Sequence, residues 1–109
     1  MPFDRLRTSY LSRLQAAAPL VRNKFVAPGD ALALLQAVVR SGDRVCIEGD
    51  NQKQADFFAR ELVKLDPAQV NHLHMIQSTV VLNEHLDVFR LGLADRLDFA
   101  YSGPQSKAL

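Results

Sequence analysis

The chain has 109 residues, of which 48% are hydrophobic, with one cysteine and a formal charge of +1 at pH 7. This length fits one small domain or part of a larger one. The near-zero charge gives no basic field that favours nucleic acid, and one cysteine excludes an internal disulfide framework and a cysteine-rich zinc site. No apolar run approaches the roughly 20 residues that span a bilayer. We therefore expect a cytoplasmic protein with no nucleic-acid and no membrane partner.

The N-terminal region is basic. Residues 1–24 carry five basic side chains against the single carboxylate of Asp4, and Ala27-Pro28-Gly29 is a turn signal that ends the region. A basic arm of this kind is compatible with a transit peptide, an RNA-contacting tail or a docking segment. The interpretation we favour is a solvated N-terminal arm over residues 1–27, followed by a separate domain over residues 28–109.

The first elements of that domain follow from apolar periodicity and turn residues. Asp30 is placed to cap a helix over residues 31–40, and Gly42 follows that helix as a terminator. Residues 44–48 predict a short, largely apolar strand. Residues 52–64 predict an amphipathic helix that stops before a proline.

The same order of elements then repeats. Residues 72–77 predict a strand, residues 83–91 a helix capped by Asn83 and closed by Gly92, and residues 97–101 a third strand. Strands that alternate with helices imply an α/β fold, a small parallel sheet with flanking helices. Three strands with two complete crossovers make a thin core. We therefore expect a truncated domain or a subunit completed by a partner.

In a parallel sheet, ligands bind beyond the carboxyl ends of the strands. Three segments are expected there, at residues 49–54, 77–79 and 102–105, and all are rich in small or amide side chains. Free N–H groups at a helix start can hold an anion or a developing oxyanion. Simple helix capping by Asp50 or Asn51 remains an alternative. The predicted substrate-binding residues are Gly49, Asn51, Gln52, Gln54, Ser102, Gly103 and Gln105.

The remaining reactive side chains give weaker evidence for a functional site. His72 and His74 have the spacing of two residues on one strand face, but we expect no carboxylate or thiol beside them and predict structural histidines rather than a metal site. His85 is expected to be a surface or packing residue. Cys46 is predicted to be buried as a small hydrophobic residue. Glu48 is the best acidic candidate at the rim, but a lone carboxylate does not define a catalytic role.

Four stretches carry a resemblance to a known family. They are GDRVCIEGDNQKQADFFARELVKLDP, VNHLHMIQSTVVLNEHLDVF, RLDFAYSGPQ and the preceding AAAPLVRNK, which together cover almost all of the chain. The sequence resembles the N-terminal portion of the malonate decarboxylase alpha subunit family, which is related to the class I coenzyme A transferases. GDNQKQADF and SGPQ are its most specific motifs. The resemblance implies that residues 28–109 are the incomplete N-terminal part of a NagB/CoA-transferase-like acyl-transferase domain.

The resemblance also implies a function. Members of the family exchange acetyl for malonyl on an acyl carrier protein thioester, acting on its phosphoribosyl-dephospho-CoA prosthetic group beside the decarboxylase subunits. They use a catalytic glutamate that forms a mixed anhydride with the acyl group. That glutamate is expected outside this chain, so none of its residues is predicted to be catalytic and the chain alone is expected to be inactive. Residues 49–54 would help to build the oxyanion pocket, and residues 102–105 a second wall.

Two other functions remain open from the residues themselves. One is a non-catalytic subunit-assembly module, in which the rim residues only cap helices. The other is a phosphate-ligand binding α/β module that uses the helix start at Gly49. Without the resemblance, the sequence does not specify the oligomeric state or the acid that is transferred.

Overall fold

The structure is a computed structural model that describes residues 2–47, 55–77 and 82–99. The chain divides into two compact units, Met1–Val39 and Arg40–Leu109. We call them the N-terminal unit and the sheet unit and describe each by itself. Among the described residues, no helix combines the length and the apolar character needed to cross a membrane.

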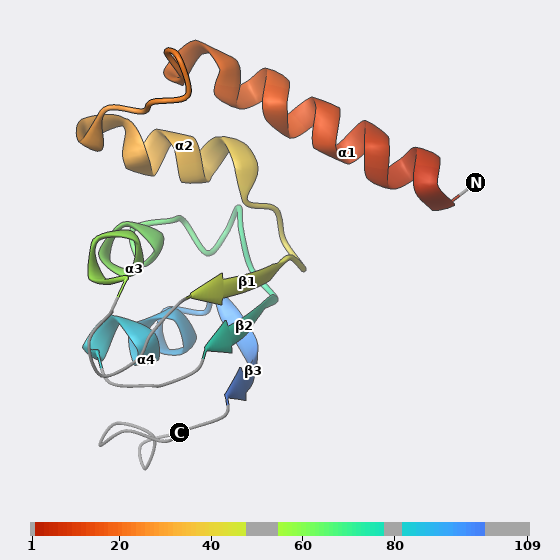
Figure 1. Ribbon diagram of the computed structural model, residues 1–109. Helices are drawn as coiled ribbons and strands as arrows, with labels where there is room; N and C mark the ends of the chain where they lie inside the picture. Colours follow the sequence, from red (N-terminus) through yellow and green to blue (C-terminus); the bar gives the residue numbers. More distant parts are fainter. Residues whose placement is uncertain (1, 48–54, 78–81, 100–109) are drawn as a thin grey trace. The chain divides into compact units, whose positions relative to one another are not determined.

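The N-terminal unit is helical (Figure 1). Its elements are α1 Pro2–Ala17, the 3-10 turns η1 Ala18–Leu20 and η2 Pro28–Asp30, and α2 Ala31–Val38. The helix predicted over residues 31–40 is confirmed, although it ends at Val38 because Val39 is extended. Asp30 occupies the N-cap position but makes no side-chain capping bond, so that part of the prediction is wrong. The turn η2 leads into the helix instead, since the N–H of Ala31 donates to the carbonyl of Pro28.

A helix was not predicted in the arm of residues 1–27, yet α1 fills most of it. Arg13 ties α1 to α2, because its Nη1 donates to the carbonyl of Val38 at 3.2 Å while its Nε donates to Ser9 Oγ at 3.1 Å. Ser9 and Arg13 are half-buried and Ala17 is buried, so small and polar residues form the packed side of α1.

The elements of the sheet unit are β1 Arg44–Ile47, α3 Asp56–Leu62, β2 Leu73–Gln77, α4 Asn83–Arg90 and β3 Ala94–Phe99. They include a parallel sheet in the order β1-β2-β3, which confirms the predicted α/β class. β2 begins only after His72, whose φ of 55° lies outside the strand region, and β3 begins three residues earlier than predicted. Gly92 closes the turn after α4 with a φ of +84°, as expected.

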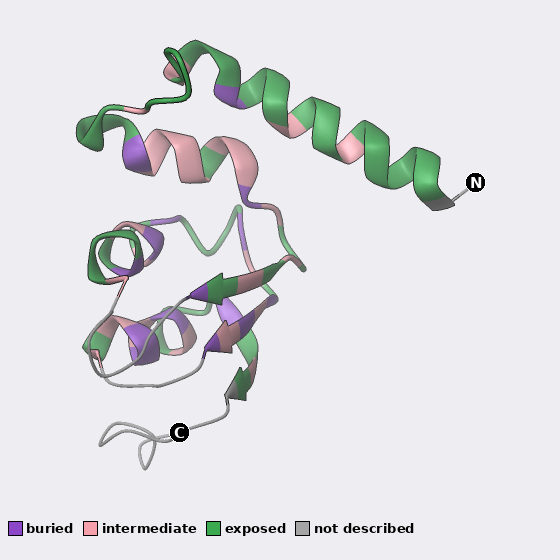
Figure 2. Cartoon of the chain, viewed as in Figure 1, coloured by how far each residue is buried: buried purple, intermediate pink, exposed green. Residues whose placement is uncertain are grey.

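Both helices of the sheet unit lie on one face of the sheet (Figures 1 and 2). Alternate strand residues point into this layer, and Leu73 and Met75 are completely buried there. Leu62 and Ala59 of α3 and Val88 of α4 complete the contact. Burial of these apolar surfaces is the main favourable term that holds the helices on the sheet.

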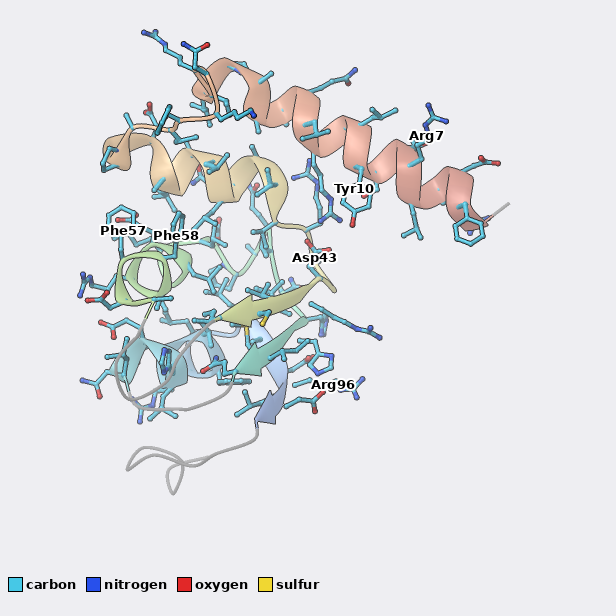
Figure 3. The ribbon with its side chains drawn as sticks, viewed as in Figure 1. Arg7, Tyr10, Asp43, Phe57, Phe58 and Arg96 are labelled. Carbon is cyan, nitrogen blue, oxygen red and sulfur yellow. The ribbon has the colours of Figure 1, made fainter. Side chains whose placement is uncertain are left out.

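No described element of the sheet unit covers the opposite face of its sheet, which we call the open face. Its strand residues are exposed or half-buried, and Figure 3 shows Arg96 extending on the side away from α3 and α4. Cys46 lies on this face and is exposed, so the prediction of a buried cysteine is wrong. Its apolar neighbours Val45 and Ile47 point the other way, toward the helices. The residues of the open face are Arg44, Cys46, His74, Ile76, Arg96 and Asp98.

Candidate functional site

The three strands end in one row. Ile47 of β1 lies beside Gln77 of β2, and Gln77 lies beside Phe99 of β3. Because the strands are parallel, the segments that follow them all leave from this carboxyl edge of the sheet. Because of this register, the three predicted rim segments begin at or just after neighbouring strand ends.

The predicted rim side chains themselves lie outside the described residues. This holds for the seven predicted substrate-binding residues and for Glu48, Ser78 and Thr79, so their roles stay predictions. They are Gly49, Asn51, Gln52, Gln54, Ser102, Gly103 and Gln105.

The described part of the carboxyl edge contains an unusual buried amide. Gln77 is the last residue of the central strand and is only 3% exposed. Together with His85 it is one of two buried polar side chains among the residues that the structure describes. Gln77 was predicted to lie in a rim segment, without a role of its own.

His85 stands in the first turn of α4, the next described helix after β2. The backbone N–H of Leu82 donates to its Nδ1 at 3.2 Å, which makes Leu82, rather than the predicted Asn83, the N-cap residue of α4. Since Nδ1 accepts this bond, the proton of the neutral ring is on Nε2. Desolvation by burial lowers the pKa of His85, although the charge of Glu84 acts in the opposite direction. His85 is thus a packing residue that stays neutral at pH 7.

His72 and His74 each lie beside a different aspartate. His72 Nδ1 lies 2.6 Å from Asp95 Oδ2, and His74 Nε2 lies 2.9 Å from Asp98 Oδ2. The expectation that no carboxylate stands beside them is wrong, because the register brings β3 and its two aspartates next to β2. The described residues contain no group of three or more His, Cys, Asp or Glu side chains arranged to hold a metal. The His72–Asp95 pair is exposed, whereas the His74 side chain is only 13% exposed and pairs with an exposed Asp98.

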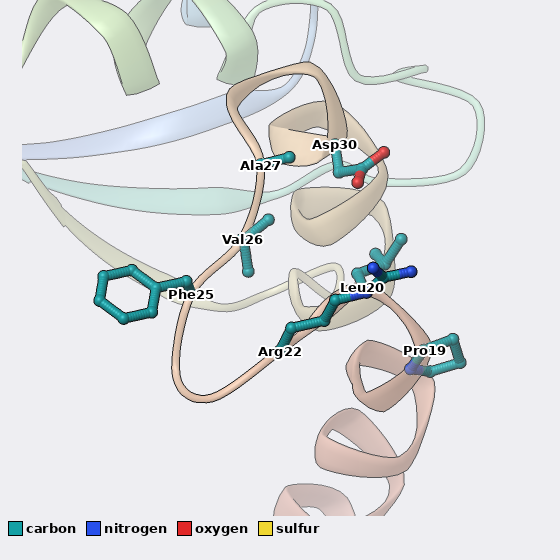
Figure 4. Close-up of a pocket in the computed structure, with 7 residues that line it drawn as sticks. All are labelled: Pro19, Leu20, Arg22, Phe25, Val26, Ala27 and Asp30. Carbon is teal, nitrogen blue, oxygen red and sulfur yellow. The ribbon is translucent and has the colours of Figure 1, made fainter.

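The N-terminal unit has a pocket of about 510 Å³, shown in Figure 4. A tight turn forms one side of it: Arg22 and Phe25 exchange two backbone hydrogen bonds of 2.8 Å around Asn23 and Lys24, which both have positive φ. One guanidinium, of Arg22, and one carboxylate, of Asp30, are its charged groups. None of the predicted site residues lines this pocket, and the arrangement suggests no reaction. Its lining is Pro19, Leu20, Arg22, Phe25, Val26, Ala27 and Asp30.

An exposed apolar stripe runs along α1. It consists of Phe3, Leu6, Tyr10 and Leu14, each between 58% and 76% exposed, and we call it the α1 stripe. Spacings of three and four residues put these side chains on one side of the helix. Figure 3 shows Tyr10 projecting away from the helix axis. An exposed apolar row of this kind is a candidate interaction surface.

These observations define an α/β protein with a parallel sheet whose three described strands end side by side at one carboxyl edge. The chain matches the family model described as malonate decarboxylase, alpha subunit, transporter, over residues 2–109. The chain belongs to this family.

Three relatives support the assignment. The chain is 49% identical over 105 residues to an acetyl-S-ACP:malonate ACP transferase of Malonomonas rubra, covering 95% of this chain and 19% of that protein. A Pseudomonas malonate decarboxylase hetero-tetramer in complex with malonate contains a chain with 44% identity and a TM-score of 0.90, with 96% of this chain and 19% of that one covered. The alpha subunit from Acinetobacter baumannii gives 38% identity and a TM-score of 0.89, with coverages of 97% and 19%. The chain thus spans about a fifth of the length of these relatives.

Proposed function

We propose that this chain forms the N-terminal part of an acyl-carrier-protein transferase that exchanges acetyl for malonyl on a carrier-protein thioester. The observation that carries the proposal is the alignment of three strand ends at one edge, in a chain 49% identical to a named transferase of this type. Parallel sheets use this edge for ligands.

In this proposal the chain binds and orients, while the nucleophilic glutamate comes from polypeptide outside it. Backbone N–H groups of residues 49–54 hold the acyl carbonyl oxygen as negative charge develops on it. Asn51, Gln52 and Gln54 add neutral donors, and Ser102, Gly103 and Gln105 form a second wall. The substrate thioester sits on the phosphoribosyl-dephospho-CoA arm of an acyl carrier protein, and the reaction takes place in the cytoplasm beside decarboxylase subunits.

The experiment is exchange of labelled malonate onto the acetylated carrier protein by the intact native protein. Loss of one oxyanion donor typically slows catalysis about 10²–10³-fold, and loss of a positioning amide is expected to have a smaller effect. Asn51→Ala and Gln52→Ala should therefore reduce the rate of exchange without changing the melting temperature. Arg60→Ala, an exposed change on α3, is the matched control and should leave exchange unchanged. Wild-type rates in both rim variants would contradict the proposal.

A second function, subunit assembly, is favoured by the α1 stripe. The N-terminal unit has five basic and two acidic side chains, and the stripe runs along the helix that carries three of the arginines. We propose that the stripe docks on a partner subunit that offers an apolar groove with an acidic rim. A relative of this chain occurs in a hetero-tetramer, which supports a multi-subunit setting.

A further inference from the structure

Gln77 is the one polar residue in a row of otherwise apolar, buried side chains on β2. It follows Leu73 and Met75 in the row of β2 side chains that point into the helix layer, and both of these are completely buried. Gln77 ends this row at the carboxyl edge, beside Ile47 and Phe99. The chain thus places a carboxamide where its own packing pattern uses leucine and methionine.

Neither polar atom of this carboxamide has a hydrogen-bond partner among the described residues. Both Oε1 and Nε2 of Gln77 are buried and unpaired there. A buried amide without partners destabilises a fold, whereas an apolar side chain of the same length does not. A buried polar group without a partner calls for a specific explanation, and a ligand that supplies the missing partner is one such explanation.

The charges of the residues around Gln77 indicate which kind of ligand could pair with its amide. His85, the other buried polar side chain of the described residues, is neutral, and no described arginine or lysine is buried. Among the described residues, the helix-covered side of the edge therefore offers an uncharged donor rather than a fixed positive charge. An amide N–H is a suitable donor for a carboxylate oxygen, and hydrogen bonds to charged groups are the stronger ones.

We propose that Gln77 is a specificity-determining residue whose side-chain N–H donates to the free carboxylate that distinguishes a malonyl group from an acetyl group. This inference rests on the transferase function proposed above. A site built to hydrogen-bond one group discriminates against an analogue that lacks it, because the buried donor is then left unpaired. Gln77 thereby favours malonyl over acetyl transfer at the same edge.

The test compares two acids and two variants in the intact native protein. The KM values of labelled malonate and labelled acetate are measured for exchange onto the carrier protein. Gln77→Met removes the amide and keeps the length of the side chain. Met75→Leu, two residues earlier in the same buried row, is the matched control for a change in packing.

For Gln77→Met we expect the KM for malonate to rise about tenfold or more. The KM for acetate and the melting temperature should stay at their wild-type values. The control variant Met75→Leu should leave the KM values of both acids unchanged. An equal change for both acids, a lower melting temperature or a failure of Gln77→Met to fold would overturn the inference, since each makes the amide a structural group. Wild-type protein that exchanges neither acid would remove the proposed function itself. Normal exchange with an unaffected Gln77→Met variant would remove only the inference.

Discussion

In the sheet unit several large apolar side chains form a core, with Leu73, Met75 and Leu93 at 0% exposure, although Phe57, Phe58 and Leu91 are 40–49% exposed. In the N-terminal unit the α1 stripe lies on the surface. The buried residues of the N-terminal unit are only Ala17, Ala31 and Val39 among those described. The sheet unit thus has a hydrophobic core of its own. The N-terminal unit presents its apolar surface outward, as a subunit interface does.

The largest expected difference between the units is in stability. Leu73→Ala removes a completely buried side chain from the sheet unit and should lower the free energy of unfolding by about 2–5 kcal/mol. Leu14→Ala in the α1 stripe removes the same atoms from an exposed site and should change it by less than about 0.5 kcal/mol. Denaturant unfolding followed by circular dichroism measures both. An equal loss of unfolding free energy in the two variants would mean that the α1 stripe is packed within the protein.

The second prediction concerns assembly. Tyr10→Asp puts a negative charge in the middle of the α1 stripe, and Ser12→Asp puts the same charge on the exposed opposite side of the helix. Desolvating an unpaired carboxylate is costly, so Tyr10→Asp should weaken binding of partner subunits at least about tenfold.

Co-purification and native mass measurement of the complex provide the readout, and Ser12→Asp should assemble normally. A complex that survives Tyr10→Asp, or loss of self-association alone, would contradict docking on an acidic partner subunit.

The third prediction uses the lowered pKa of His85 in the sheet unit. The unfolded chain takes up a proton near its ordinary pKa of about 6.5, whereas the folded protein does so only at lower pH. Stability is therefore unaffected above about pH 7 and falls as the pH drops below the unfolded pKa, by up to about 1.4 kcal/mol per pH unit.

His85→Gln is the matched variant, because glutamine at this position can still accept the N–H of Leu82 but does not titrate. It should reduce the loss of stability between pH 7 and pH 5, as measured by denaturant unfolding. An identical pH dependence in both proteins would show that His85 is not the group responsible.

The smallest expected effect contrasts two glycines. Gly92 in the sheet unit has a φ of +84°, and a Cβ there would meet only Pro67 Cβ at 3.9 Å, so Gly92→Ala should cost about 1 kcal/mol through backbone strain alone. Gly29 in the N-terminal unit has no positive φ and open space around it, so Gly29→Ala should be neutral or slightly stabilising. Thermal unfolding of both variants separates these outcomes, and a neutral Gly92→Ala would remove the strain argument.

Sequence reasoning worked best where one local signal decides the structure. The apolar runs predicted β1 and β2, and Gly92 marked the end of α4. It failed at Cys46, because an apolar four-residue strand does not show which of its faces the helices cover. The pairing of His72 and His74 with aspartates was also missed, since it depends on the register with β3.

The N-terminal helix was missed for a different reason. The spacing of Phe3, Leu6, Tyr10 and Leu14 is helical and is visible in the sequence. The arginines between them led instead to the prediction of a solvated basic arm. Gln77 lay in a predicted rim segment, although only the strand register and its burial show that its amide points into the helix layer. The side chains predicted for the site at residues 49–54 and 102–105 lie outside the described residues.

The central claim is that the acyl group is held at the carboxyl edge of the sheet. A crystal structure of the intact protein with a non-hydrolysable malonyl-thioester analogue of the carrier arm tests it most directly. We expect the acyl group beyond Ile47, Gln77 and Phe99, with its carboxylate within hydrogen-bonding distance of the Gln77 amide. An acyl group bound on the open face beside His74 and Asp98, or away from the sheet altogether, would contradict the account.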